Sequence, residues 1–138
     1  MIRNVSIFVW VRLSHVHRKY ERASTEELQH WHLSPAQFDL LTTLRASEGV
    51  TQSDLAQRLL VTQGNITQLI DKLEERGLLC RHQEGRTKCL TLTEQGRQLL
   101  DTVVPAHTAW NAEQFACLST TEQKQLLELL RKLDHAWR

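Results

Sequence analysis

The sequence predicts a mainly α-helical fold with one small β-hairpin. Through most of the chain, apolar residues recur at i, i+3, i+4 and i+7, the spacing of one buried helix face. Capping residues precede several of these stretches. The period changes to strand-like alternation only around Glu84-Gly85. With 138 residues, we expect a single domain over 1–138.

The first helix is expected from about Arg3 to Glu27, because neither Gly nor Pro interrupts this stretch. Its apolar residues spread over more than one narrow stripe: Val5, Phe8, Val9, Trp10, Leu13, Val16 and Tyr20. So wide an apolar surface needs partners on several sides. A core helix of a monomer and an intertwined dimerisation helix both satisfy this need. We favour the dimer, because the middle of the chain is too small to cover the helix.

Two shorter helices follow. Ser34-Pro35-Ala36-Gln37 supplies an N-cap, Pro at the first helical position and Gln at the third, and the helix should run to about Ala46. Thr51-Gln52-Ser53-Asp54 has the form of a capping box that opens the next helix. The buried face of that helix should carry Leu55, Ala56, Leu59 and Leu60.

A further helix begins after Thr62, a second N-cap, and Gly77 should close it. Its core face carries Ile66, Leu69, Ile70 and Leu73. The opposite face carries short uncharged polar groups around a small residue: Gln63, Gly64, Asn65, Thr67 and Gln68. Asn and Gln can bond bidentately to adenine, and a Thr methyl can touch a thymine methyl. This face, together with Thr62 at its start, therefore suits contact with double-stranded DNA, with an ordinary solvated face as the alternative.

The hairpin is expected from two short strands that flank Glu84-Gly85. Leu79, Leu90 and Leu92 share parity and should face the core. Basic residues extend this face toward the tip, and with Lys72 they are candidates for contact with DNA phosphates: Arg81, Arg86 and Lys88. Plain surface charge is the alternative for each of them.

Cys80 and Cys89 are the residues of the hairpin with potential redox chemistry. A turn at Glu84-Gly85 pairs His82 with Thr87, Arg81 with Lys88 and Cys80 with Cys89. A redox-sensing pair is then possible, although two compact, half-buried hydrophobes are favoured. Cys80, His82 and Cys89 could share one face, but three ligands without CxxC or HExxH spacing do not predict a metal site. We expect no cofactor.

Two long helices should end the chain. Thr93 caps the first of them, in which Pro105 should produce a kink or an end because proline removes a backbone N–H. Ser119-Thr120-Thr121-Glu122 is another capping box and opens the last helix. Rich in Leu and Trp, these helices should complete a dimer interface with the first helix.

At these residues the chain resembles the MarR family of winged helix-turn-helix transcription regulators. The resemblance lies in the run from Gly49 to Leu60, in the run from Ile66 to Leu79 and in Leu92-Thr93-Glu94-Gln95-Gly96. It implies a winged helix-turn-helix part over about 34–93 and helical dimerisation parts over about 1–30 and 94–138. It also implies a homodimer on a pseudo-palindromic operator, usually a repressor released by a small molecule or an oxidant.

The sequence departs from the family pattern at two places. Gln68 stands where family members usually have Arg, so base preference should differ. The wing is about three residues shorter than the common form, and the role of its tip is carried over to Arg86. The resemblance further implies an effector cavity between the dimerisation helices and the winged unit. Its candidate walls are His17, Tyr20, Trp31 and Phe38.

Composition limits the alternatives. A net charge of +1 is low for a DNA-binding protein and leaves open a winged-helix protein-interaction module. Catalytic motifs are not recognisable, so we do not expect an enzyme. Three Cys without framework spacing predict a reducing compartment, which we take to be the cytoplasm. The apolar run Ile7–Val11 is too short to span a membrane.

Overall fold

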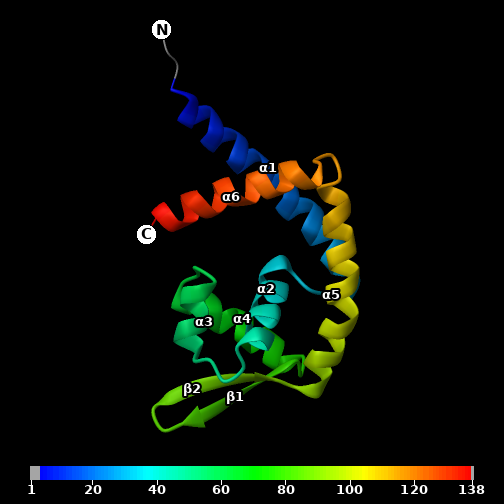
Figure 1. Cartoon of the computed structure of the whole chain (residues 1–138). Coiled ribbons are helices and arrows are strands. Elements are labelled where there is room, and N and C mark those ends of the chain that lie inside the picture. The colour runs from blue at the N-terminus through cyan, green and yellow to red at the C-terminus, as the bar shows by residue number, and fades with distance from the viewer. Residues whose placement is uncertain (1–3, 138) are drawn as a thin grey trace. The chain divides into compact units, whose positions relative to one another are not determined.

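The computed structural model describes residues 4–137 and confirms the mainly α-helical fold with a small β-hairpin (Figure 1). Contacts divide the chain into a unit of residues 1–103 and a unit of residues 104–138. The elements in chain order are α1 (Val5–Leu28), the 3-10 turn η1 (Gln29–Trp31), α2 (Pro35–Ala46), α3 (Gln52–Arg58), α4 (Gln63–Glu75), β1 (Leu79–Glu84), β2 (Thr87–Leu92), α5 (Glu94–Gln114) and α6 (Thr120–Ala136).

The core of the first unit lies between α2, α3, α4 and the hairpin. Fully buried Leu and Ile side chains fill it, among them Leu40, Leu41, Leu44, Leu55, Ile66, Ile70, Leu73, Leu79 and Leu90. Burial of such a side chain contributes about 1.5–3 kcal/mol. The predicted core faces of α4 and of the hairpin are therefore confirmed, with Leu69 only half-buried.

The predicted helix starts are also confirmed. Ser34 and Gln37 form a reciprocal capping box at α2, and Ser119 and Glu122 form one at α6. At α3 the capping is one-sided, because the Thr51 hydroxyl accepts the Asp54 N–H at 3.1 Å. Thr62 and Thr93 accept the N–H groups of Asn65 and Gly96 in the same way.

The prediction that Leu60 is buried is wrong, because α3 ends before it. Leu60 is 89% exposed and adopts a left-handed backbone with φ of 54°. Its N–H donates to the Gln57 carbonyl and the Val61 N–H donates to the Ala56 carbonyl, which is the Schellman pattern of a helix C-terminus. Leu60 thus occupies the position that glycine usually takes, and Leu59 is half-buried at the C-cap.

The predicted hairpin register is wrong by two residues. Glu84 pairs with Thr87, so the two-residue loop is Gly85-Arg86, and Gly85 has a φ of 60°. Cys89 therefore pairs with His82, whereas Cys80 pairs with Thr91. The physical reason is that a tight two-residue turn needs a positive φ at its first central residue, which is where Gly85 stands.

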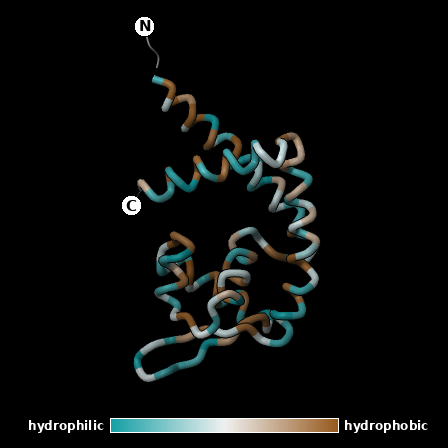
Figure 2. Tube along the Cα trace, in the orientation of Figure 1, coloured by the Kyte–Doolittle hydropathy of each residue, from teal (hydrophilic) through white to brown (hydrophobic). Residues whose placement is uncertain are grey.

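The long helices match their predicted spans. Helix α1 begins at Val5, and the expected start at Arg3 lies outside the described residues. Hydrophobic residues recur along its N-terminal half (Figure 2), and six are more than half exposed: Val5, Ile7, Phe8, Val9, Trp10 and Val11. Helix α5 continues through Pro105 to Gln114, so this proline does not end it. Among the described helices, none is both long and apolar enough to cross a membrane.

Candidate DNA-binding surface

The surface begins with the first turns of α4. Thr62 caps the helix: its hydroxyl oxygen accepts a hydrogen bond from the Asn65 backbone N–H at 3.2 Å. The side of α4 away from the core is exposed and carries Gln63, Gly64, Asn65, Gln68 and Lys72. The buried Ile66, Ile70 and Leu73 fix this rotation of the helix. The amides therefore face outward from a rigid element.

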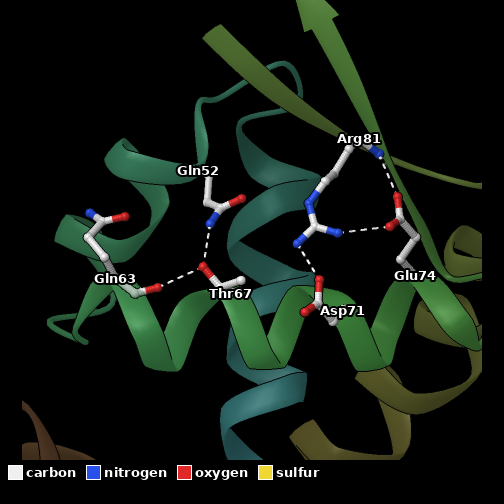
Figure 3. A network of polar contacts seen from close by, with 6 residues as sticks. All are labelled: Gln52, Gln63, Thr67, Asp71, Glu74 and Arg81. Carbon is white, nitrogen blue, oxygen red and sulfur yellow. Dashed lines mark hydrogen bonds and ion pairs between the residues drawn. The ribbon is translucent and has the colours of Figure 1, made fainter.

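Thr67 behaves differently from its neighbours, because its hydroxyl is occupied within the chain (Figure 3). The hydroxyl donates to the Gln63 carbonyl at 2.8 Å and accepts from Nε2 of Gln52, also at 2.8 Å. Gln52 stands at the start of α3, so this pair of hydrogen bonds joins α3 to α4. Thr67 is half-buried, and with its hydroxyl occupied only its methyl group is left for contact with a partner.

Arg81 of β1 is also committed within the chain. Its Nη2 lies 2.6 Å from Oδ1 of Asp71, and its Nη1 lies 2.8 Å from Oε1 of Glu74 (Figure 3). The Arg81 backbone N–H donates to the other Glu74 oxygen at 3.2 Å. Burial opposes the charged guanidinium, but the hydrogen bonds to Asp71 and Glu74 outweigh it and raise the pKa of Arg81. This cluster, named the Arg81 clamp, fastens the wing to α4.

The wing tip carries the free basic charge of the hairpin. Arg86 and Lys88 are exposed, with Arg86 in the two-residue loop. They border a shallow groove together with Thr87 of β2. Its other walls come from the N-terminal ends of α3 and α4, namely Thr51, Gln52, Ser53 and Gln63. Two cations, several hydroxyls and helix N-termini converge there. Such a surface favours an anion such as a backbone phosphate.

The candidate effector residues lie on α1, η1 and α2. Tyr20, Trp31 and Phe38 are half-buried, whereas His17 is exposed with Nε2 at 3.9 Å from Oε1 of Glu21. Burial, and after it the carboxylate of Asp39, raises the pKa of Tyr20 above its ordinary value; Glu21 and Glu27 add to this. Acidic residues of α1 and α2 therefore lie near Tyr20, and the ring of Trp31 packs edge-on against His30 with centroids 5.0 Å apart.

The hairpin cysteines are free thiols and half-buried. In the observed register they lie diagonally on one face and are not directly opposite, so the expected cross-strand pair is not formed. Cys89 Sγ lies 3.9 Å from Oε2 of Glu84, and the His82 ring nitrogen lies 2.9 Å from the Thr91 hydroxyl. A disulfide between Cys80 and Cys89 would require a change of register.

Sequence reasoning missed three residues of this surface. They are Gln52 of α3 and Asp71 and Glu74 of α4. The spacing of the two acids did contain a signal, because i and i+3 lie on one face of a helix and can hold one arginine together. Nothing in the local sequence indicates that Gln52 bonds to Thr67, fifteen residues away.

Comparison with known proteins gives a consistent result. The model of the MarR family matches residues 33–85. A Bacillus cereus protein described as an uncharacterized HTH-type transcriptional regulator is 35% identical over 130 residues, which cover 94% of this chain and 88% of that protein. A MarR-family regulator from Rhodococcus sp. RHA1 is 27% identical with a TM-score of 0.86, over 96% of both chains. A mutant E. coli MarR complexed with operator DNA is 26% identical with a TM-score of 0.85, over 94% and 96%.

Proposed function

Because the chain belongs to the MarR family of DNA-binding transcription regulators and is not an enzyme, we propose that it acts in the cytoplasm as a homodimeric repressor. Its target is a pseudo-palindromic operator of double-stranded DNA with half-sites about one helical turn apart. A small molecule releases it. The observation that carries the proposal is that Gln63, at the start of the exposed polar face of α4, borders the same groove as the wing cations Arg86 and Lys88.

In this proposal α4 enters the major groove. Gln63, Asn65 and Gln68 contact base edges, because an amide offers a donor and an acceptor that together match adenine. Arg86 and Lys88 contact phosphates beside the groove, with Lys72 as a further cation on α4. We leave Arg81 out of the DNA contacts, because Asp71 and Glu74 already hold its guanidinium. Thr62 and Thr67 support the helix through their hydroxyls.

The dimer is supported by the exposed apolar surface of α1. Six apolar residues between Val5 and Val11 are more than half exposed, including Phe8 and Trp10. A contiguous apolar surface of this kind marks an interface. A two-fold dimer presents two copies of α4, and the two-fold symmetry explains why the operator is pseudo-palindromic.

Release by a small molecule rests on the α1–α2 junction, where Tyr20, Trp31 and Phe38 line the proposed effector site and His17 lies at its edge. Arg76, the C-cap of α4, links this region to the DNA-binding helix. Its Nη1 donates to the His32 carbonyl at 2.6 Å, and its Nη2 donates to the Trp31 carbonyl at 3.3 Å. A ligand that displaces Trp31 would therefore move the end of α4. Oxidation of Cys80 with Cys89 is not proposed, because the register separates them.

The direct test is selection of duplexes from random-sequence DNA with the wild-type protein, followed by affinity measurements at several salt concentrations. We expect a two-fold symmetric consensus. Arg86→Ala should weaken binding to all duplexes alike and reduce the salt slope by about 1 per protomer. Gln68→Ala should cost about 1–3 kcal/mol at particular base pairs.

Lys19→Ala is the matched control, because it removes the same charge from an exposed position on α1. It should leave both the affinity and the salt slope unchanged. A selection that enriches no duplex, together with a purified protein that captures a protein partner, would favour the protein-interaction module instead. The low net charge of +1 is the observation that favours this second candidate.

A further inference from the structure

Gly64, in the first turn of α4, has no reason within the fold to be glycine. Three of the five glycines have a positive φ, namely Gly49, Gly77 and Gly85. At Gly96 a Cβ would lie 2.1 Å from the Leu78 carbonyl oxygen. At Gly64 the φ lies outside the left-handed region and a Cβ would meet no atom within 4 Å. Alanine would therefore fit this position without strain.

Glycine at such a position has a cost. It loses more backbone freedom on folding than alanine and weakens a helix in which it lies. Leu60, on the other side of the Thr62 cap, has a similar cost, because a left-handed backbone disfavours a side chain with a Cβ. Leu60 lies in the α3–α4 turn, Gly64 lies in the first turn of α4, and both are exposed. Stability of the free chain explains neither of them, so we look for a reason outside the chain.

The position of Gly64 indicates what that reason is. Gly64 and Gln68 are four residues apart on α4 and lie on the same exposed face. Gln63 and Asn65, its neighbours in sequence, carry exposed amides. At Gly64 itself the space in which a Cβ would lie is open, so the helix backbone is accessible there. Glycine is the residue that lets a backbone approach a ligand closely.

We infer that Gly64 is the point of closest approach between α4 and DNA. A base edge in the major groove occupies the space in which a Cβ would lie, and the surrounding amides contact the neighbouring bases. This inference rests on the proposed function and deepens it. It assigns a specificity role to the absence of a side chain, so that Gly64→Ala opposes DNA binding by steric exclusion and not by loss of charge.

The test compares stability with DNA affinity in the same variants. The probe is a fluorescent duplex recovered from random-sequence DNA with the wild-type protein, and binding is measured by anisotropy at several salt concentrations. Gly64→Ala should raise Tm by about 2–4 °C. The same change should weaken binding at least about 10-fold, as overpacking does. Gly64→Val should bind more weakly still. Because the effect is steric, the salt slope should not change.

The matched control is Ala36→Gly. Ala36 is the second residue of α2 and is exposed, as Gly64 is the second residue of α4 and is exposed. This reverse exchange should lower Tm and leave the affinity unchanged. If Gly64→Ala binds the duplex within about two-fold of wild type, or if it lowers Tm, the inference is wrong while the proposed function stands. If the wild-type protein recovers no duplex, the proposed function fails and this inference fails with it.

Discussion

Replacement of Arg81 by alanine tests the connection between the wing and α4. The change removes the contact of Nη2 with Asp71 at 2.6 Å and the contact of Nη1 with Glu74 at 2.8 Å. The Arg81 side chain is only 21% exposed, but its partners are 53% and 41% exposed, so solvent screens both pairs. We therefore assign each pair about 0.5 kcal/mol, within the range of exposed ion pairs. Lost packing of the Arg81 stem brings the expected destabilisation to about 1.5–2 kcal/mol.

Urea unfolding of single and double variants measures these values. The variants combine Arg81→Ala with Asp71→Asn and with Glu74→Gln. Each double-mutant cycle should give a coupling energy of about 0.5 kcal/mol. In 1 M salt the coupling should fall, because screening acts strongly on partly exposed pairs. Asp101→Asn is a control, because Asp101 pairs with Arg45 on α2 and should show no coupling to Arg81.

The salt dependence of DNA binding distinguishes the Arg81 clamp from the phosphate contact that the sequence predicted for Arg81. As a phosphate contact, Arg81 would contribute about 1 to the salt slope of each protomer. As part of the clamp it makes no phosphate contact, so Arg81→Ala should weaken binding while the slope falls by much less than about 1. Coupling energies below about 0.2 kcal/mol together with a slope reduced by about 1 would refute the clamp and restore the phosphate contact.

Three further predictions concern the fold. Gly96→Ala should lower the free energy of unfolding by at least about 2 kcal/mol in urea, because the new Cβ would lie 2.1 Å from the Leu78 oxygen; an unchanged midpoint would contradict the close approach of α5 to Leu78, the residue before β1. Leu60→Gly should raise the free energy of unfolding by about 1 kcal/mol, because glycine relieves the strain of the left-handed backbone. A decrease in the free energy of unfolding would show instead that the exposed Leu60 side chain makes stabilising contacts. Tyr20, the only tyrosine, should titrate above its ordinary pKa of 10.0 by ultraviolet absorbance, and Asp39→Asn should lower that midpoint. Because the folded-state pKa is raised, the stability due to neutral Tyr20 is full below pH 10 and is lost as the pH rises through the folded value, a loss that Tyr20→Phe should remove.

Most of the fold was predictable because local signals agree with the global packing. Four helix starts are marked by a Ser or Thr whose side-chain oxygen accepts the backbone N–H three residues later: Ser34, Thr51, Thr62 and Ser119. The residue type and the spacing of such a cap can be read from the sequence. Leu60 shows where this reasoning fails. Its spacing fits the buried stripe of α3, but the helix ends at Arg58 and the Schellman bonds place Leu60 just beyond the C-cap. Periodicity reports which residues would share a face and does not report where the helix stops.

The hairpin shows a second limit. One glycine in a tight turn does not say which central position it takes, and the two assignments differ by two residues in register. A slip of two keeps every side chain on its face, so Leu79 and Leu90 were correctly assigned to the core. The same slip separates Cys80 from Cys89 and removes the redox pair. The alternation of residues along a strand therefore predicts which side chains face the core. Which residues pair across the two strands depends on the geometry of the turn.

The Arg81 clamp also bears on the low net charge. Asp71 and Glu74 lie on exposed parts of α4, where free carboxylates would repel phosphates. By pairing with both, Arg81 offsets this repulsion without itself contacting DNA. In the proposed complex, positive charge for phosphates comes from Lys72, Arg86 and Lys88, which are all exposed. A protein with a net charge of +1 can bind DNA in this way, and few phosphate contacts predict a modest salt dependence per protomer.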